Sequence, residues 1–163
     1  METKDRAKHV APGEGKALWV AGDLVTFKVV GEDTGGAYSL LEVVSNFGGG
    51  PPPHVHHRED EIFCVLEGEH EVSIGERTIR AGAGSVVYGP RNVSHAYKNV
   101  GATPGRILGF VAPAGLEGFF EEVGEEATDE SSPPPFGQKE IKRLLAAAPK
   151  YGIEILPPST RAQ

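Results

Sequence analysis

Three histidines and one glutamate are spaced so that their side chains can meet at one point. His54 and His56 lie two residues apart, and Glu61 and His95 follow them. In an extended strand successive side chains point to opposite faces, so His54 and His56 project to the same side as a pair of imidazole ligands. Glu61 opens an apolar run, which predicts a carboxylate at the rim of an apolar interior. Three imidazoles and one carboxylate suit one divalent transition metal (Fe, Mn, Ni, Co, Cu or Zn) and leave coordination positions open.

The histidine pair has a second interpretation, and the other histidines and the cysteine are expected to lie outside the metal site. HVHH alone is equally typical of a polar, histidine-rich loop, because isolated histidine pairs are weak signals. His57 is out of phase with its two neighbours, so we expect it either to face outward or to support a ligand without binding the metal itself. His70 follows the turn at Gly68 and is expected at the surface. Cys64 is out of phase with Glu61 and is expected to be a buried small hydrophobe, not a nucleophile.

Short strands must position these side chains. Residues 17–47 hold two alternating runs of β-branched and aromatic residues, separated by the turn-like EDTGG. The prolines of 48–53 exclude a regular helix and predict a stiff, extended lead into the strand that begins at His54. From residue 60 to 113, strand-length runs are bounded by Gly, Pro or Asn. This spacing predicts an all-β sandwich or barrel.

The chain divides into three parts by composition. Residues 1–16 are expected to form an N-terminal arm, and residues 17–124 a barrel with a closing helix. The helix is predicted because apolar residues recur at helical spacing at Leu116, Phe119, Phe120 and Val123. Residues 125–163 begin as an acidic, proline-rich linker and continue into a tail with a short amphipathic helix.

Charge and composition exclude several classes of partner. The 163 residues carry a net charge of −7, which repels phosphate backbones and argues against nucleic acid. A single cysteine cannot form an internal disulfide, and the charged start of the chain is unlike a signal peptide, so a cytoplasmic location is expected. No apolar stretch approaches the roughly 18 residues that a membrane span needs.

Residues 48–99 resemble the two motifs of the cupin superfamily. The first motif, G(X)5HXH(X)4E(X)6G, is met at Gly48, His54, His56, Glu61 and Gly68. The second, G(X)5PXG(X)2H(X)3N, is met at Gly84, Pro90, His95 and Asn99. Asn92 stands where the family usually has Gly, and Asn tolerates the positive φ that this turn requires. The resemblance implies a jelly-roll-type β-barrel with short C-terminal helices, and metal ligands at His54, His56, Glu61 and His95.

The resemblance also suggests an activity. The stretches PPPHVHHREDEIFCVLEG and PAGLEGFFEEVG are most similar to single-domain quercetinase-like cupins, which are metal-dependent dioxygenases acting on flavonols and related enols. Glu61 would be a ligand, and it could also be the general base that takes a substrate proton. Two alternatives remain: isomerase or lyase chemistry without O2, and non-enzymatic binding of a small molecule.

Strand parity predicts the pocket and a covered outer surface. The side chains expected around the metal are apolar or aromatic: Phe63, Val65, Val72, Ile74, Tyr97 and Phe110. Both faces of the strand at residues 62–66 are apolar, so a second layer, the C-terminal helix or a partner subunit should cover the outside. Because cupins commonly dimerise, the resemblance favours a homodimer.

Overall fold

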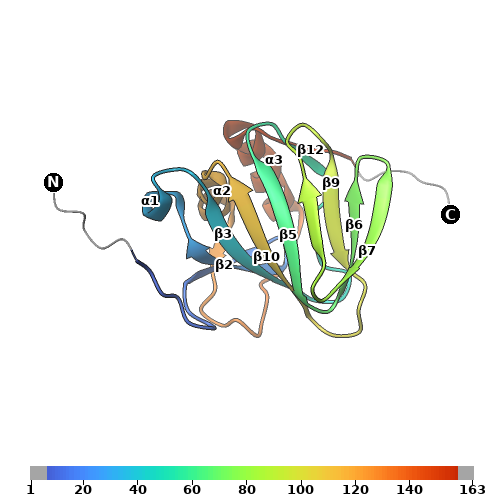
Figure 1. Cartoon of the computed structure of the whole chain (residues 1–163), viewed down its shortest axis with the longest axis horizontal. Coiled ribbons are helices and arrows are strands. Elements are labelled where there is room, and N and C mark those ends of the chain that lie inside the picture. The colour runs from blue at the N-terminus through green and yellow to red at the C-terminus, as the bar shows by residue number, and fades with distance from the viewer. Residues whose placement is uncertain (1–6, 158–163) are drawn as a thin grey trace.

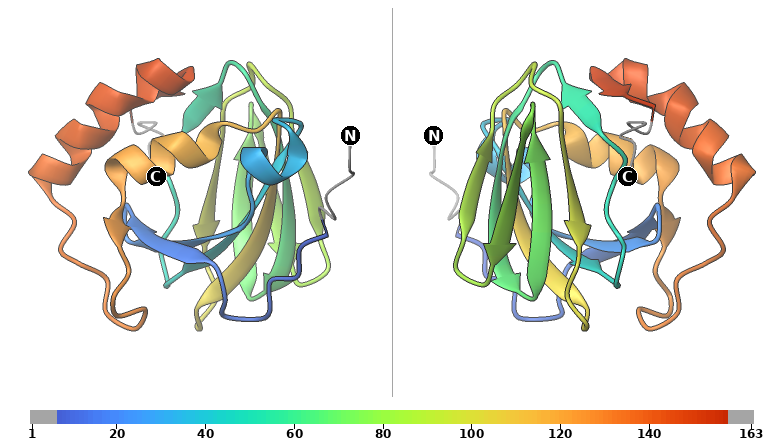
Figure 2. Two further views of the ribbon diagram at one scale, coloured as in Figure 1. Left: turned by 90° about the vertical axis from the view of Figure 1, so that its left-hand side faces the viewer. Right: turned by 90° about the vertical axis from the view of Figure 1, so that its right-hand side faces the viewer.

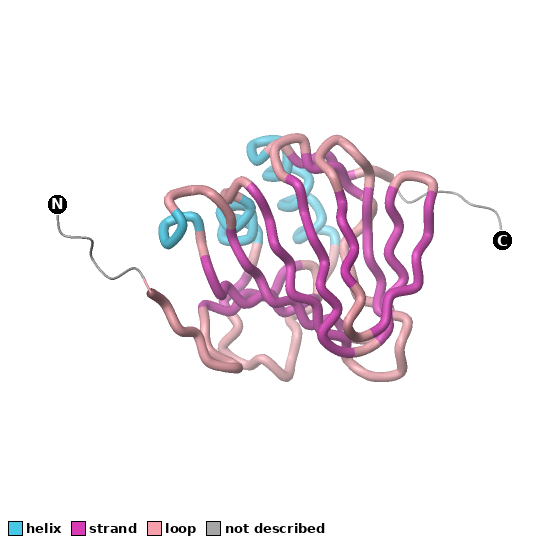
Figure 3. The backbone as a smooth tube through the Cα atoms, viewed as in Figure 1, coloured by secondary structure: helices cyan, strands magenta, loops and turns pink. Residues whose placement is uncertain are grey.

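The structure, a computed structural model that describes residues 7–157, consists mainly of two antiparallel β-sheets (Figures 1 and 3). The first sheet has the strand order β11 (Glu125–Glu126), β1 (Lys16–Val20), β2 (Asp23–Val29), β3 (Ser39–Ser45), β10 (Gly105–Ala112), β5 (Asp60–Glu67) and β8 (Val86–Gly89). The second has the order β12 (Ile153–Ile155), β4 (His54–His56), β9 (His95–Asn99), β6 (Glu69–Ile74) and β7 (Arg77–Gly82). This arrangement confirms the all-β prediction.

The alternation of side chains along β10 illustrates how the sequence forms the barrel wall. Ile107, Gly109 and Val111 are buried, whereas Leu108 and Phe110, between them, are only partly buried. This strand pairs with β3 on one side and β5 on the other. The register therefore fixes which side chains of all three strands point into the barrel.

Two groups of buried side chains form the core. One cluster joins β1, β2 and β3 to the C-terminal segments through residues such as Phe27, Leu41, Phe119 and Ile153. The other fills the interior between β5, β6, β7, β8 and β10 with Phe63, Val65, Val72, Ala81, Val87 and Ile107. The barrel therefore has one half closed by its own strands and another half that needs the C-terminal segments to complete its core.

The helices are short and gather on one side. α1 spans Gly31–Thr34, α2 spans Leu116–Val123, and α3 (Gln138–Ala147) continues into the 3-10 helix η1 (Ala148–Tyr151). Figure 2 shows α2 and α3 side by side, with α3 outermost. Within residues 7–157 no helix is long and apolar enough to cross a membrane.

The tail returns to the barrel. Glu122 on α2 accepts hydrogen bonds from Lys150 Nζ and Tyr151 Oη, and β12 then pairs with β4. The two residues of β11 pair with β1, so only the stretch after them is an exposed connection. Residues 1–6 of the expected arm and 158–163 of the expected tail lie outside the described residues.

The outer face of β5 and β8, at one end of the first sheet, is not covered by the described part of the chain. Leu66, Val86 and Tyr88 are 44%, 67% and 55% exposed. Cys64 on the same face is half-buried, which corrects the expectation that it lies in the core. The C-terminal helix does not cover this face, because it packs against α2 instead.

Candidate metal centre

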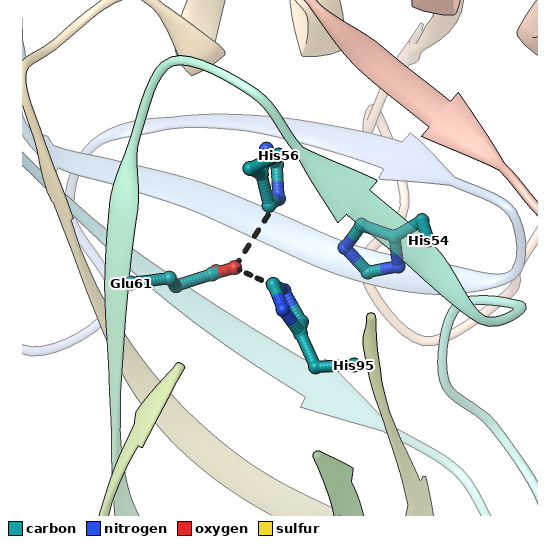
Figure 4. A group of neighbouring side chains, drawn as sticks. All are labelled: His54, His56, Glu61 and His95. Carbon is teal, nitrogen blue, oxygen red and sulfur yellow. Dashed lines mark hydrogen bonds and ion pairs between the residues drawn. The ribbon is translucent and has the colours of Figure 1, made fainter. Parts of the chain in front are cut away.

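His54, His56, Glu61 and His95 converge inside the barrel (Figure 4). Each offers one ligand atom, and these atoms all lie within 4.8 Å of one another. β4 supplies His54 and His56, β5 supplies Glu61, and β9 supplies His95 directly opposite His54. The alternation predicted for the HVH segment thus brings both imidazoles to the same interior point.

Backbone carbonyls fix the orientation of two of the imidazole rings. His54 Nδ1 donates to the carbonyl oxygen of Pro52 at 2.9 Å, and His95 Nδ1 donates to that of Val93 at 3.2 Å. A carbonyl oxygen can only accept, so each Nδ1 carries the hydrogen and Nε2 is directed to the centre. Glu61 Oε2 lies 3.0 Å from His95 Nε2 and 3.3 Å from His56 Nε2. The Nε2 atoms of His95 and His56 therefore both lie close to the same carboxylate oxygen.

The charges of this buried group depend strongly on one another. Burial, followed by the charges of His95 and His56, lowers the pKa of His54 to about 3. Burial also disfavours the charged form of His56, but the adjacent carboxylates of Glu59 and Glu61 outweigh it and raise its pKa to about 9. Burial would raise the pKa of Glu61, yet His56 and His95 lower it below its usual range.

The buried carboxylate of Glu61 needs a positive charge beside it, as it would have in a cation site. A proton on His56 balances the buried Glu61 carboxylate where an ion would otherwise do so. Three imidazoles directed by their Nε2 atoms and one carboxylate form a donor set that fits a divalent transition metal. The residues present could therefore hold such an ion, and the ion would have to displace that proton.

A cavity of about 100 Å³ adjoins the candidate metal centre. His54, His56 and Glu61 line one side of it. Apolar residues of the C-terminal segments form another part of its wall: Leu116, Phe119 and Phe120 of α2, Leu144 of α3, and Ile153 and Ile155 of β12. Within residues 7–157 its lining includes no Lys or Arg. The cavity therefore suits an uncharged, partly apolar molecule that reaches the ligand group with a polar atom.

The residues predicted for the pocket from strand parity do not all lie at the cavity. Phe63 and Tyr97 line the cavity. Val65 and Val72 are buried in the core cluster beyond it, and Ile74 packs against that cluster. Phe110 is wrong: it is out of phase with Ile107 and Gly109, which line the cavity, and it stacks on Tyr38 at 5.1 Å.

Two other histidines, His57 and His70, lie outside the ligand group. His57 is exposed, with Nδ1 2.9 Å from Asn92 Oδ1 and Nε2 3.0 Å from Glu154 Oε2, so it lies outside the ligand group as expected. The surface position expected for His70 is wrong, because the side chain is fully buried. His70 shares its strand face with Val72, which had been placed inside, so the turn at Gly68 does not interrupt the alternation that follows it.

Asp23 and Glu59 are buried carboxylates near the site that the sequence analysis missed. Asp23 lines the cavity, is 5% exposed, and accepts a hydrogen bond from Tyr97 Oη at 3.1 Å. Burial raises its pKa to about 6, against hydrogen bonds from Ser45 and Tyr97 that lower it. Glu59 is 4% exposed and lies beside His56. Asp23 is in phase with the buried Val25 and Phe27, so strand alternation could have indicated its burial, whereas Glu59 precedes the apolar run of β5 and no periodicity marks it.

The turns of the two motifs have the backbone conformation that was expected. Asn92, which replaces the usual glycine, has φ 65°, so it adopts the left-handed conformation that Asn tolerates. Gly48, Gly68 and Gly84 also have positive φ.

The fold and the site together define a β-barrel protein with a candidate metal centre in its interior. Residues 42–111 match the family model for the Cupin domain, and the chain therefore contains a cupin domain.

Comparisons with known proteins agree with this assignment. The chain is 26% identical over 144 residues to quercetin 2,3-dioxygenase of Aspergillus japonicus, covering 80% of this chain and 41% of that protein. It is 40% identical over 77 residues to germin-like protein subfamily 2 member 2 of Arabidopsis thaliana, covering 43% of this chain and 34% of that protein. The chain thus spans less than half of either relative.

Solved structures share the fold at low sequence identity. A predicted oxalate decarboxylase from Thermotoga maritima aligns with a TM-score of 0.61 and 19% identity. The alignment covers 65% of this chain and 99% of that one. At this identity the likeness concerns the barrel alone.

Proposed function

We propose that this chain is a metal-dependent dioxygenase that acts on a small flavonol-like or enol substrate. The observation that carries the proposal is a four-residue ligand group that opens onto an apolar cavity. The similarity to a quercetin 2,3-dioxygenase over 80% of the chain supports the reaction class. Fold alone would not, because one barrel can host many chemistries.

His54, His56, Glu61 and His95 would hold the ion. When bound, it would polarise a substrate oxygen and, if redox-active, would supply the chemistry of O2. Glu61 has the position of a general base, because its carboxylate lines the cavity beside the ligand nitrogens. It would accept the proton of a substrate hydroxyl that reaches the ligand group.

The cavity favours the smaller and uncharged members of this substrate class. With no Lys or Arg in its described lining, no basic side chain compensates the charge of a small dianion. Its volume of about 100 Å³ is below the roughly 300 Å³ at which drug-sized ligand pockets begin. A small enol or β-diketone fits these properties better than a large flavonol does.

Oxygen uptake by the metal-loaded protein tests the proposal. We expect O2 consumption with at least one substrate from a panel of β-diketones, small enols, catechols and flavonols, and no turnover under anaerobic conditions. Turnover without O2 would assign the protein to isomerase or lyase chemistry. Binding without turnover in either atmosphere, across several metals, would identify a small-molecule-binding module.

We further propose that two copies associate through the uncovered outer face of the first sheet. Across its strands Phe110 lies between Leu40 and Ile62, and Ile62 lies beside Tyr88. Exposed apolar patches of this kind are typical of interaction sites, and β8 is an edge strand that a second copy could pair with. Sedimentation should then show a dimer, and Val86→Glu should produce the monomer.

A further inference from the structure

His56 differs from the other two histidines in the group that its Nδ1 faces. The Nδ1 atoms of His54 and His95 each donate to a backbone carbonyl. His56 Nδ1 instead lies 3.4 Å from Oε2 of Glu59, three residues further along the chain. A side-chain carboxylate thus occupies the position that a neutral carbonyl oxygen occupies for the other two rings.

The two facing atoms are buried and lack other partners. His56 is 3% exposed and Glu59 is 4% exposed. Neither His56 Nδ1 nor Glu59 Oε2 has a hydrogen-bond partner among the described residues. Glutamate is almost never fully buried unless it is paired, and buried polar atoms without a partner are rare in proteins. A small rotation of the imidazole ring would join these two atoms to each other.

We propose that Glu59 is a positioning residue for the metal ligand His56. This inference rests on the proposed metal site. When an ion binds Nε2, the hydrogen of the neutral ring is on Nδ1, and it would be donated to Glu59 Oε2. Such a carboxylate partner fixes the ring orientation and makes the ligand nitrogen a stronger donor.

The pair also affects the charge balance of the centre. With three neutral imidazoles, Glu61 contributes the only negative charge of the ligand group itself. Glu59 adds a second carboxylate, which contacts the ligand His56 and not the ion, so that two carboxylates lie near one divalent ion. The buried position of Glu59 strengthens this interaction, because little water screens it.

Asp60, the next residue, provides a matched control. It carries the same charge but turns to the surface, where its carboxylate accepts hydrogen bonds from the backbone N–H, Nε and Nη2 of Arg91. Asp60→Asn therefore removes one negative charge near the site without touching His56. It separates a direct contact from a general change in net charge.

Titration of the metal-free protein with Co²⁺, followed by the visible absorption of the bound ion, tests the inference. We expect Glu59→Gln to raise the Kd about 10- to 100-fold and to shift the Co²⁺ absorption bands. Asp60→Asn should stay within about twofold of the wild type and keep its spectrum. The melting temperatures of the metal-free variants serve as a control for folding.

The outcomes are distinct. Wild-type Kd and spectrum in Glu59→Gln would overturn the role of Glu59 and leave the metal site intact. Equal weakening in Glu59→Gln and Asp60→Asn would also overturn it, since net charge would then explain the effect. No Co²⁺ binding by the wild type would remove the metal site itself. If Glu59→Gln does not fold, Glu59→Asp, which keeps the charge but shortens the reach, should show the weaker binding and the altered spectrum; an unchanged spectrum would contradict the inference.

Discussion

The two sides of the cavity are built in opposite ways. The ligand side consists of polar residues on β4, β5 and β9, which neighbouring strands and tight turns hold in place. Another part of the wall consists of apolar residues on α2, α3 and β12, which come from the end of the described chain. We infer that local strand alternation determines the chemistry of the centre, whereas long-range packing of the C-terminal segments determines which molecules reach it.

Glu61→Gln should have the largest effect on the ligand side. Glutamine keeps the size and one oxygen ligand but loses nearly all basicity, so part of the metal should remain bound. If Glu61 takes the substrate proton, activity per bound metal should fall at least about 100-fold, the lower range of general-base contributions. Activity and metal content are measured on the same samples. A loss that only follows metal content would restrict Glu61 to a ligand role.

Asp23→Asn examines the one carboxylate besides Glu61 among the described residues that line the cavity. The pKa of Asp23 is raised from 3.8 to about 6, so the folded state binds more protons than the unfolded state between these values. Wild-type stability should therefore fall as pH rises through this interval, by up to about 3 kcal/mol from this group. The variant cannot titrate there.

The comparison uses urea unfolding of the metal-free wild type and Asp23→Asn at pH 4 and pH 8. Relative to the wild type, Asp23→Asn should be more stable at pH 8 than at pH 4, because all other titrating groups are shared. A difference between the two proteins that does not change with pH would show that the Asp23 carboxyl titrates normally.

Removal of a single imidazole should empty the centre. His95→Ala deletes a ligand, so metal occupancy after purification should drop at least tenfold, since even the loss of a hydrogen-bond partner of a ligand costs about that much. His57→Ala is the matched control, because His57 contacts Asn92 and Glu154 at the surface. Equal metal loss in both variants would contradict the assignment of His57 as a residue outside the ligand group.

A change in the apolar wall should alter substrate selection and spare the metal. Leu144 lines the cavity, whereas its neighbour Leu145 is 51% exposed. Leu144→Ala should change the KM for a small substrate about tenfold, the scale of lost apolar contact in a pocket, with metal content unchanged. Leu145→Ala should leave both near wild type. A loss of metal in Leu144→Ala would show that the two sides are not independent.

The ligand group could be predicted from the sequence because it depends on local rules. Strand periodicity places His54 and His56 together, and motif spacing adds Glu61 and His95. The all-β fold follows from the many short runs bounded by turn residues. The left-handed turn at Asn92 was expected for the same reason, since it depends on one residue's own backbone preference.

The rest of the site depends on contacts that no local pattern contains. Asp23 meets Tyr97 across 74 residues, and the tail reaches the site only because β12 pairs with β4. Strand alternation also gives a wrong prediction where it is unknown which residue of a strand points inward. At Phe110 the residues on both sides line the cavity or lie in the core, so Phe110 itself points the other way. The surface position predicted for His70 was wrong for a simpler reason: His70 lies two residues before Val72 and so shares its strand face, but this alternation was not applied to it.

Metal content of the wild-type protein, purified without added metal and measured by elemental analysis, tests the central claim most directly. The structure predicts one divalent first-row transition metal per chain, or its uptake when the metal-free protein is titrated with Mn²⁺, Fe²⁺, Co²⁺, Ni²⁺, Cu²⁺ and Zn²⁺ in turn. Protein that contains none of these metals and binds none of them on titration would contradict the metal centre, and with it the proposed oxygen chemistry.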